Sequence, residues 1–213
     1  MTKPVVLLGS GGHARVLLDI LQRSNIEILG LVDPHRSTGS LWLDCPVLGN
    51  DEIIFDLSPA SIELVNGIGS LPGDAGLRAQ LFSHFRSRGY RFKTLIDPLA
   101  FIAGNVVLKE GVQIMVGAIV QTGVSIGENS IINSGAIIEH DCQIGINVHI
   151  APGSVLSGGV SVGDRGHIGT GATVIQNIRI GHDSVIGAGA VVTRDVANHQ
   201  IVYPARSQIQ DKT

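Results

Sequence analysis

The sequence predicts two domains of different fold class, a small Rossmann-like α/β domain over residues 1–94 and a parallel β-helix over residues 95–197, followed by a tail over residues 198–213. Three observations predict this division. A glycine-rich turn follows an apolar strand near the N-terminus, hydrophobic residues recur at every sixth position in the second half, and the chain holds 28 glycines but only 4% aromatic residues. Frequent glycine with few aromatics indicates a backbone that turns often around an aliphatic core.

The first 94 residues have the strand and helix pattern of a short α/β domain. The expected elements are, in order, a strand at residues 5–8, a helix at 14–23, strands at 28–32 and 62–65, a helix at 75–87 and a strand at 92–96. The domain is too short for the six strands of a complete dinucleotide-binding fold. Its length favours a nucleotide-linked sugar as the ligand, with NAD and a purely structural turn as the alternatives.

The segment between the first strand and the first helix reads Gly-Ser-Gly-Gly-His-Ala over residues 9–14. Gly9, Gly11 and Ala14 fit the G-x-G-x-x-G/A fingerprint, and Asp33 follows at the end of the second strand. Glycines at such a turn let the backbone approach a diphosphate, and the helix N-terminus directs free N–H groups toward it. We therefore predict a phosphate-binding turn, with Asp33 accepting a hydrogen bond from a base or ribose.

The second half repeats with a period of six residues. Every sixth residue is aliphatic, in the series Ile96, Ile102, Leu108, Ile114, Val120, Ile126, Ile132, Ile138, Ile144, Ile150, Leu156, Val162, Ile168, Val174, Ile180, Ile186 and Val192. Four residues after each comes a mostly small or β-branched side chain, often preceded by Gly, Asn or Asp, which tolerate a left-handed backbone at a corner. Three such hexads would form one coil of a β-helix, whereas a β-sandwich would show this period only by chance.

Composition excludes several classes of partner. The net charge of −3 and the pI of about 6.2 leave no basic surface for nucleic acid or anionic membranes. The sequence shows neither a signal-like N-terminal segment nor an apolar run of membrane-spanning length. Cys45 and Cys142 are too few for a disulfide framework. We expect a cytoplasmic protein that binds small molecules or other protein chains.

A domain that begins Leu-Gly-Ser-Gly-Gly-His, joined to hexads that contain Ile-Ile-Glu-His-Asp at residues 137–141, resembles the family of sialic acid O-acetyltransferases and sugar-nucleotide 4-amino N-acetyltransferases. The resemblance covers nearly the whole chain. It implies a left-handed β-helix and acetyl transfer from acetyl-CoA to an amino or hydroxyl group of a sugar, in bacterial surface glycan biosynthesis. It also implies a homotrimer with active sites between neighbouring β-helices. The substrate that we favour is a UDP-linked 4-amino-4,6-dideoxy sugar, with GDP-linked amino sugars and sialic acid as alternatives.

The resemblance further implies roles for individual residues. His140 corresponds to the general base, a task that suits imidazole because its ordinary pKa lies near physiological pH. Asp141 replaces the usual Glu and would raise the basicity of His140 if its shorter side chain reaches the ring, and Asn133 would orient that ring or touch the sugar. Contacts to acetyl-CoA are assigned to His149, Gly158, Thr170 and Ala188, and contacts to the nucleotide to Gly11, Gly12, His13, Asp33, Pro34 and Gly69. Val202 stands where the family has glycine, which would alter a local CoA contact.

The period of the repeat gives an independent prediction about the same site. Residues eighteen apart occupy one column on successive coils, about 4.8 Å apart. Gly158 therefore lies directly over His140, where glycine leaves room for a thioester and a backbone N–H for its oxyanion. His149 is half a coil away from His140, so the two cannot easily share a pocket within one subunit. The column thus favours a site between subunits.

Two other functions compete with acetyl transfer. A metal-dependent hydratase similar to the gamma carbonic anhydrases would use zinc held by histidines, and His149 and His167 do stack eighteen residues apart. Its His-x₄-His pair is missing, however, so we expect no metal. A scaffold protein without chemistry is the other alternative. We expect His167, His182 and His199 to be solvated surface residues and Cys142 to be buried.

Overall fold

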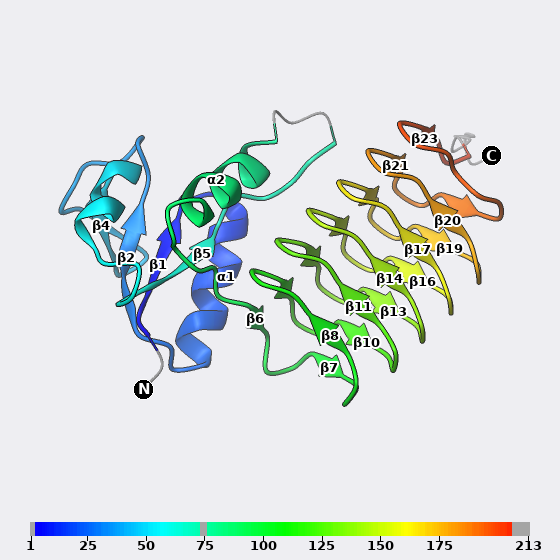
Figure 1. Cartoon of the computed structure of the whole chain (residues 1–213), viewed down its shortest axis with the longest axis horizontal. Helices are drawn as coiled ribbons and strands as arrows, with labels where there is room; N and C mark the ends of the chain where they lie inside the picture. The colour runs from blue at the N-terminus through cyan, green and yellow to red at the C-terminus, as the bar shows by residue number, and fades with distance from the viewer. Residues whose placement is uncertain (1–2, 73–75, 206–213) are drawn as a thin grey trace, which may run out of the picture.

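The computed structural model describes residues 3–72 and 76–205, whose two parts lie end to end (Figure 1). The N-terminal part is a five-stranded sheet in the order β3-β4-β2-β1-β5, parallel throughout except for the β3–β4 pair. Its elements are β1 (Val5–Leu8), α1 (Gly12–Arg23), β2 (Ile28–Val32), β3 (Leu41–Trp42), β4 (Cys45–Gly49), the 3₁₀ helix η1 (Asp51–Asp56), β5 (Glu63–Asn66) and α2 (Leu77–Arg86). This arrangement is Rossmann-like, as predicted.

Hydrophobic burial on both faces holds this sheet. All four residues of β1 are buried, as expected of a central parallel strand that helices cover on both sides. One face packs against Leu17, Leu18 and Leu21 of α1, and the other packs against Phe82 and Phe85 of α2. The expected second helix at 75–87 is α2, although residue 75 lies outside the described residues.

The β3–β4 hairpin and η1 are elements that the sequence did not predict. Leu43 and Asp44 connect the two strands with φ angles of 49° and 62°, so both residues occupy the left-handed region that a two-residue hairpin turn requires. Such turns are usually recognised by Asn-Gly or Asp-Gly, and Leu-Asp gives no such signal. The hairpin extends the sheet beyond β2 and brings Gly49 next to Asp33.

The C-terminal part is a left-handed β-helix whose strands form three flat faces. Face 1 comprises β6 (Leu95–Ile96), β9 (Gln113–Ile114), β12 (Ile131–Ile132), β15 (His149–Ile150), β18 (His167–Ile168), β21 (Val185–Ile186) and β23 (Ile201–Val202). Face 2 comprises β7 (Phe101–Ile102), β10 (Ile119–Val120), β13 (Ile137–Ile138), β16 (Val155–Leu156), β19 (Thr173–Val174) and β22 (Val191–Val192). Face 3 comprises β8 (Val107–Leu108), β11 (Ser125–Ile126), β14 (Gln143–Ile144), β17 (Ser161–Val162) and β20 (Arg179–Ile180).

The hexad series forms the interior of this solenoid. Parallel pairs such as Ile119↔Ile137 and Ile137↔Val155 are eighteen residues apart, which confirms the predicted coil. The aliphatic residues from Ile114 to Val192 are buried, and Cys142 is buried among them at the small inward position. Ile96 differs, with 37% of its surface exposed, because the first coil has no preceding coil to cover it.

The last coil departs from the eighteen-residue spacing. Ile180 pairs with Val196 and Val185 with Ile201, so these partners are sixteen residues apart. The solenoid therefore continues past residue 197 into β23, within the segment that the sequence suggested as a tail. Two fewer residues in this coil also explain why the aliphatic series stops at Val192.

A buried contact joins the two parts. Met115 and Ile131 of the first coils share a hydrophobic cluster with α1 and β1. Arg23 of α1 donates two hydrogen bonds to the buried carboxylate of Asp97, at 2.6 and 3.3 Å. The β-helix is therefore fixed against the N-terminal sheet. Neither helix in the described residues is long and apolar enough to cross a membrane.

Candidate active site

The glycine turn between β1 and α1 has the geometry of a phosphate-binding turn. Gly9 has a φ of 83°, and a Cβ there would lie 2.7 Å from Ile68 Cδ1, so glycine is required. Gly11 caps α1 without a side-chain hydrogen bond, and no acidic residue occupies the first turn of this helix. A Cβ on Gly11 or Gly12 would meet nothing within 4 Å. The N-terminus of α1 is thus open to an anionic ligand.

A cavity of about 540 Å³ lies where this turn meets the β-helix. Its lining includes Gly11, Gly12, His13 and Gly69 from the N-terminal domain and Asn133 and His149 from the β-helix. Of the ten residues expected to bind nucleotide or acetyl-CoA, five line this one cavity, together with Asn133 from the expected catalytic set. Residues from the two domains therefore line one shared cavity.

His149 is held as a neutral ring in the wall of this cavity. Its Nδ1 donates to the Ser70 carbonyl (2.7 Å), which leaves Nε2 to accept from Asn133 Nδ2 (3.1 Å). The Asn133 amide is itself oriented, because its Oδ1 accepts from the Ser134 N–H at 2.8 Å. Burial lowers the pKa of His149. Both ring nitrogens are engaged, which argues against zinc at the His149–His167 stack.

His13, which also lines this cavity, is likewise held neutral. Gln113 Nε2 donates to the Asn66 carbonyl (2.9 Å), so its Oε1 faces His13 and accepts from His13 Nε2 at 2.8 Å. Burial, with a smaller contribution from the Arg78 charge, lowers the pKa of His13 to about 4. His13 therefore offers Nδ1 as an acceptor and bears no positive charge near neutral pH.

Asp33 and Pro34 line a second cavity, of about 670 Å³, at the carboxyl end of β2. The Asp33 carboxylate accepts from Ser10 Oγ (2.5 Å) and from the backbone N–H of His35 (2.9 Å). Partial burial opposes ionisation, yet these hydrogen bonds hold the pKa of Asp33 below its usual value. Arg36 donates to the same Ser10 hydroxyl. The carboxylate is therefore ionised and positioned where open α/β sheets bind ligands.

His140 and Asp141 occupy the corner between faces 2 and 3, away from both cavities. His140 Nδ1 lies 2.9 Å from Asp141 Oδ2, so the shorter acidic side chain does reach the ring. Asp141 has a φ of 62°, the left-handed corner conformation that Asp tolerates. Both side chains are exposed in the single chain. A carboxylate on Nδ1 fixes the tautomer that leaves Nε2 free as a base.

Gly158 lies over His140, as the column predicts. A Cβ on Gly158 would be 2.5 Å from His140 Cε1 and Nε2, so only glycine leaves the ring this space. Within the described residues, the Gly158 N–H has no hydrogen-bond acceptor. The imidazole of His140 and a free backbone donor thus adjoin one another.

The remaining expected residues lie on the corner between faces 1 and 2. Thr170 and Ala188 are exposed and stack on successive coils, with Gly189 N donating to the Thr170 carbonyl at 2.8 Å. Asn133 begins the same corner on a lower coil, so it contacts His149 and not His140. Within one chain, face 2 of the solenoid therefore separates His140, with Asp141 and Gly158, from the corner that carries Asn133, Thr170 and Ala188.

Arg78 of α2 is a site neighbour that the sequence did not single out. Its guanidinium is buried and donates to the carbonyls of Asn66 (2.9 Å), Ile68 (2.8 Å) and Asn129 (3.1 Å). Burial lowers its pKa to about 9. It connects the turn after β5 to the β-helix and places a positive charge near both His13 and His149. An arginine on an amphipathic helix usually faces solvent, so no sequence signal marks this one.

Comparisons with known proteins identify the family and the fold. The family profile of the PglD N-terminal domain matches residues 4–84, and the profile of the hexapeptide repeat of succinyl-transferase matches residues 135–176 and 159–194. No curated protein sequence matches the chain. WeeI from Acinetobacter baumannii, at 23% identity and a TM-score of 0.75, covering 94% of this chain and 96% of its own, shows the shared fold.

Two further structures are more similar in sequence. A mutant of GDP-perosamine N-acetyltransferase from Caulobacter crescentus, in complex with CoA and GDP-perosamine, is 36% identical over 99% of both chains, with a TM-score of 0.85. The acetyltransferase domain of PglB from Neisseria gonorrhoeae, in complex with acetyl coenzyme A, is 28% identical over 98% of this chain and 100% of its own, with a TM-score of 0.87. The chain therefore belongs to the family of sugar-nucleotide N-acetyltransferases that join a PglD-type N-terminal domain to a hexapeptide β-helix, and it is an acetyl-CoA-dependent acetyltransferase.

Proposed function

We propose that this enzyme acetylates the 4-amino group of a nucleotide-linked 4-amino-4,6-dideoxy sugar. The observation that supports this most is the cavity between the domains, which is lined by the open N-terminus of α1 and by the Asn133–His149 pair. A diphosphate would bind at the glycine turn through backbone N–H groups. The base and ribose would extend toward Asp33 and Pro34, and the sugar toward the β-helix.

His140 is the proposed general base. With Asp141 on Nδ1, His140 Nε2 takes the proton that the amine loses as its nitrogen attacks the thioester carbonyl. Acetyl-CoA supplies the activated acyl group and leaves as the thiol. The Gly158 N–H donates to the oxygen that becomes negative in the tetrahedral intermediate. Collapse of that intermediate breaks the carbon–sulfur bond and forms the amide.

We place each active site between two subunits of a homotrimer. His140 and Asp141 are exposed and lie outside the cavity that holds Asn133 and His149. His140 of one subunit would face the cavity of its neighbour, with acetyl-CoA passing Thr170 and Ala188 on the adjoining corner. The column spacing, which separates His140 from His149 by half a coil, supports this arrangement.

The nucleotide is the least constrained part of the proposal. The family resemblance favours UDP, whereas the relative at 36% identity was solved with GDP-perosamine, which supports GDP. Hydroxyl acceptors, including sialic acid, are the alternative because a general base and an oxyanion donor serve oxygen as well as nitrogen.

A free-thiol release assay with acetyl-CoA tests the acceptor. We expect release with a UDP- or GDP-linked 4-amino sugar and none with the matched 4-hydroxy sugar or with sialic acid. Mass spectrometry of the product should show one added acetyl group on the sugar. Thiol release with sialic acid alone would contradict the proposed N-acetylation and show that the enzyme is an O-acetyltransferase.

A further inference from the structure

Two histidines and an aspartate meet on the corner between faces 3 and 1, near the C-terminal end of the solenoid. His182 and Asp183 precede β21, and His199 precedes β23 on the last coil. The sixteen-residue spacing of that coil stacks His199 over Asp183, with His199 N donating to the His182 carbonyl at 3.0 Å. The regular eighteen-residue spacing would instead have placed Ile201 in this column.

The side chains of these three residues converge. His182 Nδ1 lies 2.7 Å and His199 Nδ1 lies 3.9 Å from the same oxygen, Asp183 Oδ2. One potential ligand atom from each residue lies within 4.8 Å of those from the other two. A tetrahedral ion with metal–ligand bonds of about 2.1 Å needs ligand atoms about 3.4 Å apart. Small rotations of the exposed His199 ring and the half-buried His182 ring would reach that spacing.

We propose that His182, Asp183 and His199 bind a divalent transition metal ion, represented by Zn²⁺, with water completing the coordination. Two imidazoles and one carboxylate form a ligand set that first-row divalent ions prefer. The site is separate from acetyl transfer, because His140 lies on a different corner and His149 is engaged with Ser70 and Asn133. Its role is to fasten the short last coil to the preceding one.

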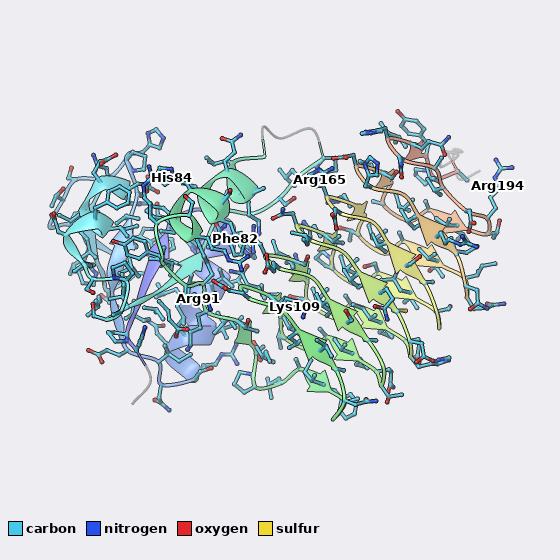
Figure 2. The ribbon with its side chains drawn as sticks, viewed as in Figure 1. Phe82, His84, Arg91, Lys109, Arg165 and Arg194 are labelled. Carbon is cyan, nitrogen blue, oxygen red and sulfur yellow. The ribbon has the colours of Figure 1, made fainter. Side chains whose placement is uncertain are left out.

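Arg165 competes for the same carboxylate. It stacks eighteen residues before Asp183 and donates from Nε and Nη2 to Oδ1 and Oδ2, both at 2.6 Å. Figure 2 shows Arg165 on the edge of the β-helix nearest the N-terminal domain, and its side chain is 53% exposed. The guanidinium can therefore turn into solvent when the metal binds. Removal of Arg165 should then raise the affinity for Zn²⁺.

Zinc titration of the enzyme tests the site. The protein carries no polyhistidine tag and is treated with EDTA before the titration to remove bound metal. Calorimetry of the wild type should detect a site that takes one Zn²⁺ per chain. His199→Asn removes one ligand yet keeps a residue that tolerates the φ of 59° at this position, and it should weaken binding at least tenfold. His84→Gln is the control, since His84 lies on α2, far from Arg165 in Figure 2, and should bind as the wild type does.

Two further measurements make the result decisive. Saturating Zn²⁺ should raise the melting temperature of the wild type by several degrees and leave that of His199→Asn unchanged. Arg165→Met should bind Zn²⁺ more tightly than the wild type. Equal zinc affinity in wild type and His199→Asn overturns the site, and loss of acetyl transfer in EDTA-treated wild type overturns its separation from catalysis.

Discussion

His140 depends at the residue scale on two neighbours that are close in different ways. Asp141 is adjacent in sequence and accepts from Nδ1, whereas Gly158 is adjacent only through the coil and leaves space at Nε2. The first fixes the tautomer and the second keeps the basic nitrogen accessible. The proposed base therefore requires a local turn and a neighbouring coil at once.

Substitution of the proposed base separates chemistry from binding. His140→Ala should lower kcat by about 10² to 10⁴, the typical contribution of a positioned general base. Asp141→Asn keeps a residue that tolerates positive φ but removes the negative charge, so it should lower kcat by a smaller factor. Steady-state kinetics with both substrates measures this. Unchanged kcat in His140→Ala would reassign the base.

Substitution over the base tests the column. Gly158→Val adds a side chain whose Cβ alone would lie 2.5 Å from His140, so it should displace the ring and weaken acetyl-CoA binding. Gly104→Ala is a matched control because a Cβ there meets nothing within 4 Å. Calorimetric titration with CoA compares the two variants. Equal CoA affinity in Gly158→Val and wild type would contradict the proposed contact.

At the element scale, α1 and the first coils form one polar network around His13. Gln113 of β9 links His13 to Asn66 at the end of β5, so three elements orient a single imidazole. Burial, with the nearby positive charge of Arg78, disfavours protonation of this ring at Nδ1, although the hydrogen bond to Gln113 acts in the opposite direction. Acidification should therefore weaken the junction.

The pH dependence of stability follows from that network. The folded pKa of His13, about 4, lies below its unfolded value of about 6.5, so the unfolded chain binds more protons between these pH values. The neutral His13 ring therefore contributes to the free energy of unfolding. This stabilisation is fully present above about pH 6.5 and is lost as pH falls toward 4, by at most about 3 kcal/mol. Urea unfolding at pH 7.5 and 5.0 measures it at fixed chain concentration. His13→Gln should lose less stability on acidification than the wild type, and an equal loss would refute the assignment.

At the scale of the whole molecule, the proposed base is exposed and lies outside the cavity, so the proposed site needs a second subunit. His140 of one subunit would act on a sugar bound by another, so two different inactive variants can complement each other. Gly12→Glu suits this test, because its side chain enters open space, favours the N-terminus of α1 and repels a diphosphate.

Mixed trimers check this arrangement directly. His140→Ala and Gly12→Glu should each be inactive alone. Coexpression in equal amounts should restore about one quarter of wild-type activity, because only sites that combine the intact half of each variant function. Each variant must first be shown to form the same oligomer as the wild type. No recovery from well-assembled mixtures would place each site within one chain.

The fold was largely predictable because its signals are local and repeated. The hexad series and the left-handed corner residues specify the coil, and the glycine turn with Asp33 specifies the β-α-β unit. The β3–β4 hairpin was not predictable, since Leu43 and Asp44 give no turn signal. The open first coil and the sixteen-residue last coil depend on what lies above and below them, which no repeat encodes.

The sequence by itself determined the β-helix, its eighteen-residue column and hence the position of Gly158 over His140. Only the tertiary structure decided that Asn133 pairs with His149, that the buried Arg78 connects the two domains, and that His182 and His199 converge on Asp183. The physical reason is the range of the interactions. Periodic burial is visible as a repeat among residues that are close in sequence. A buried charge or a hydrogen bond between side chains depends instead on the packing of segments that are distant in the chain.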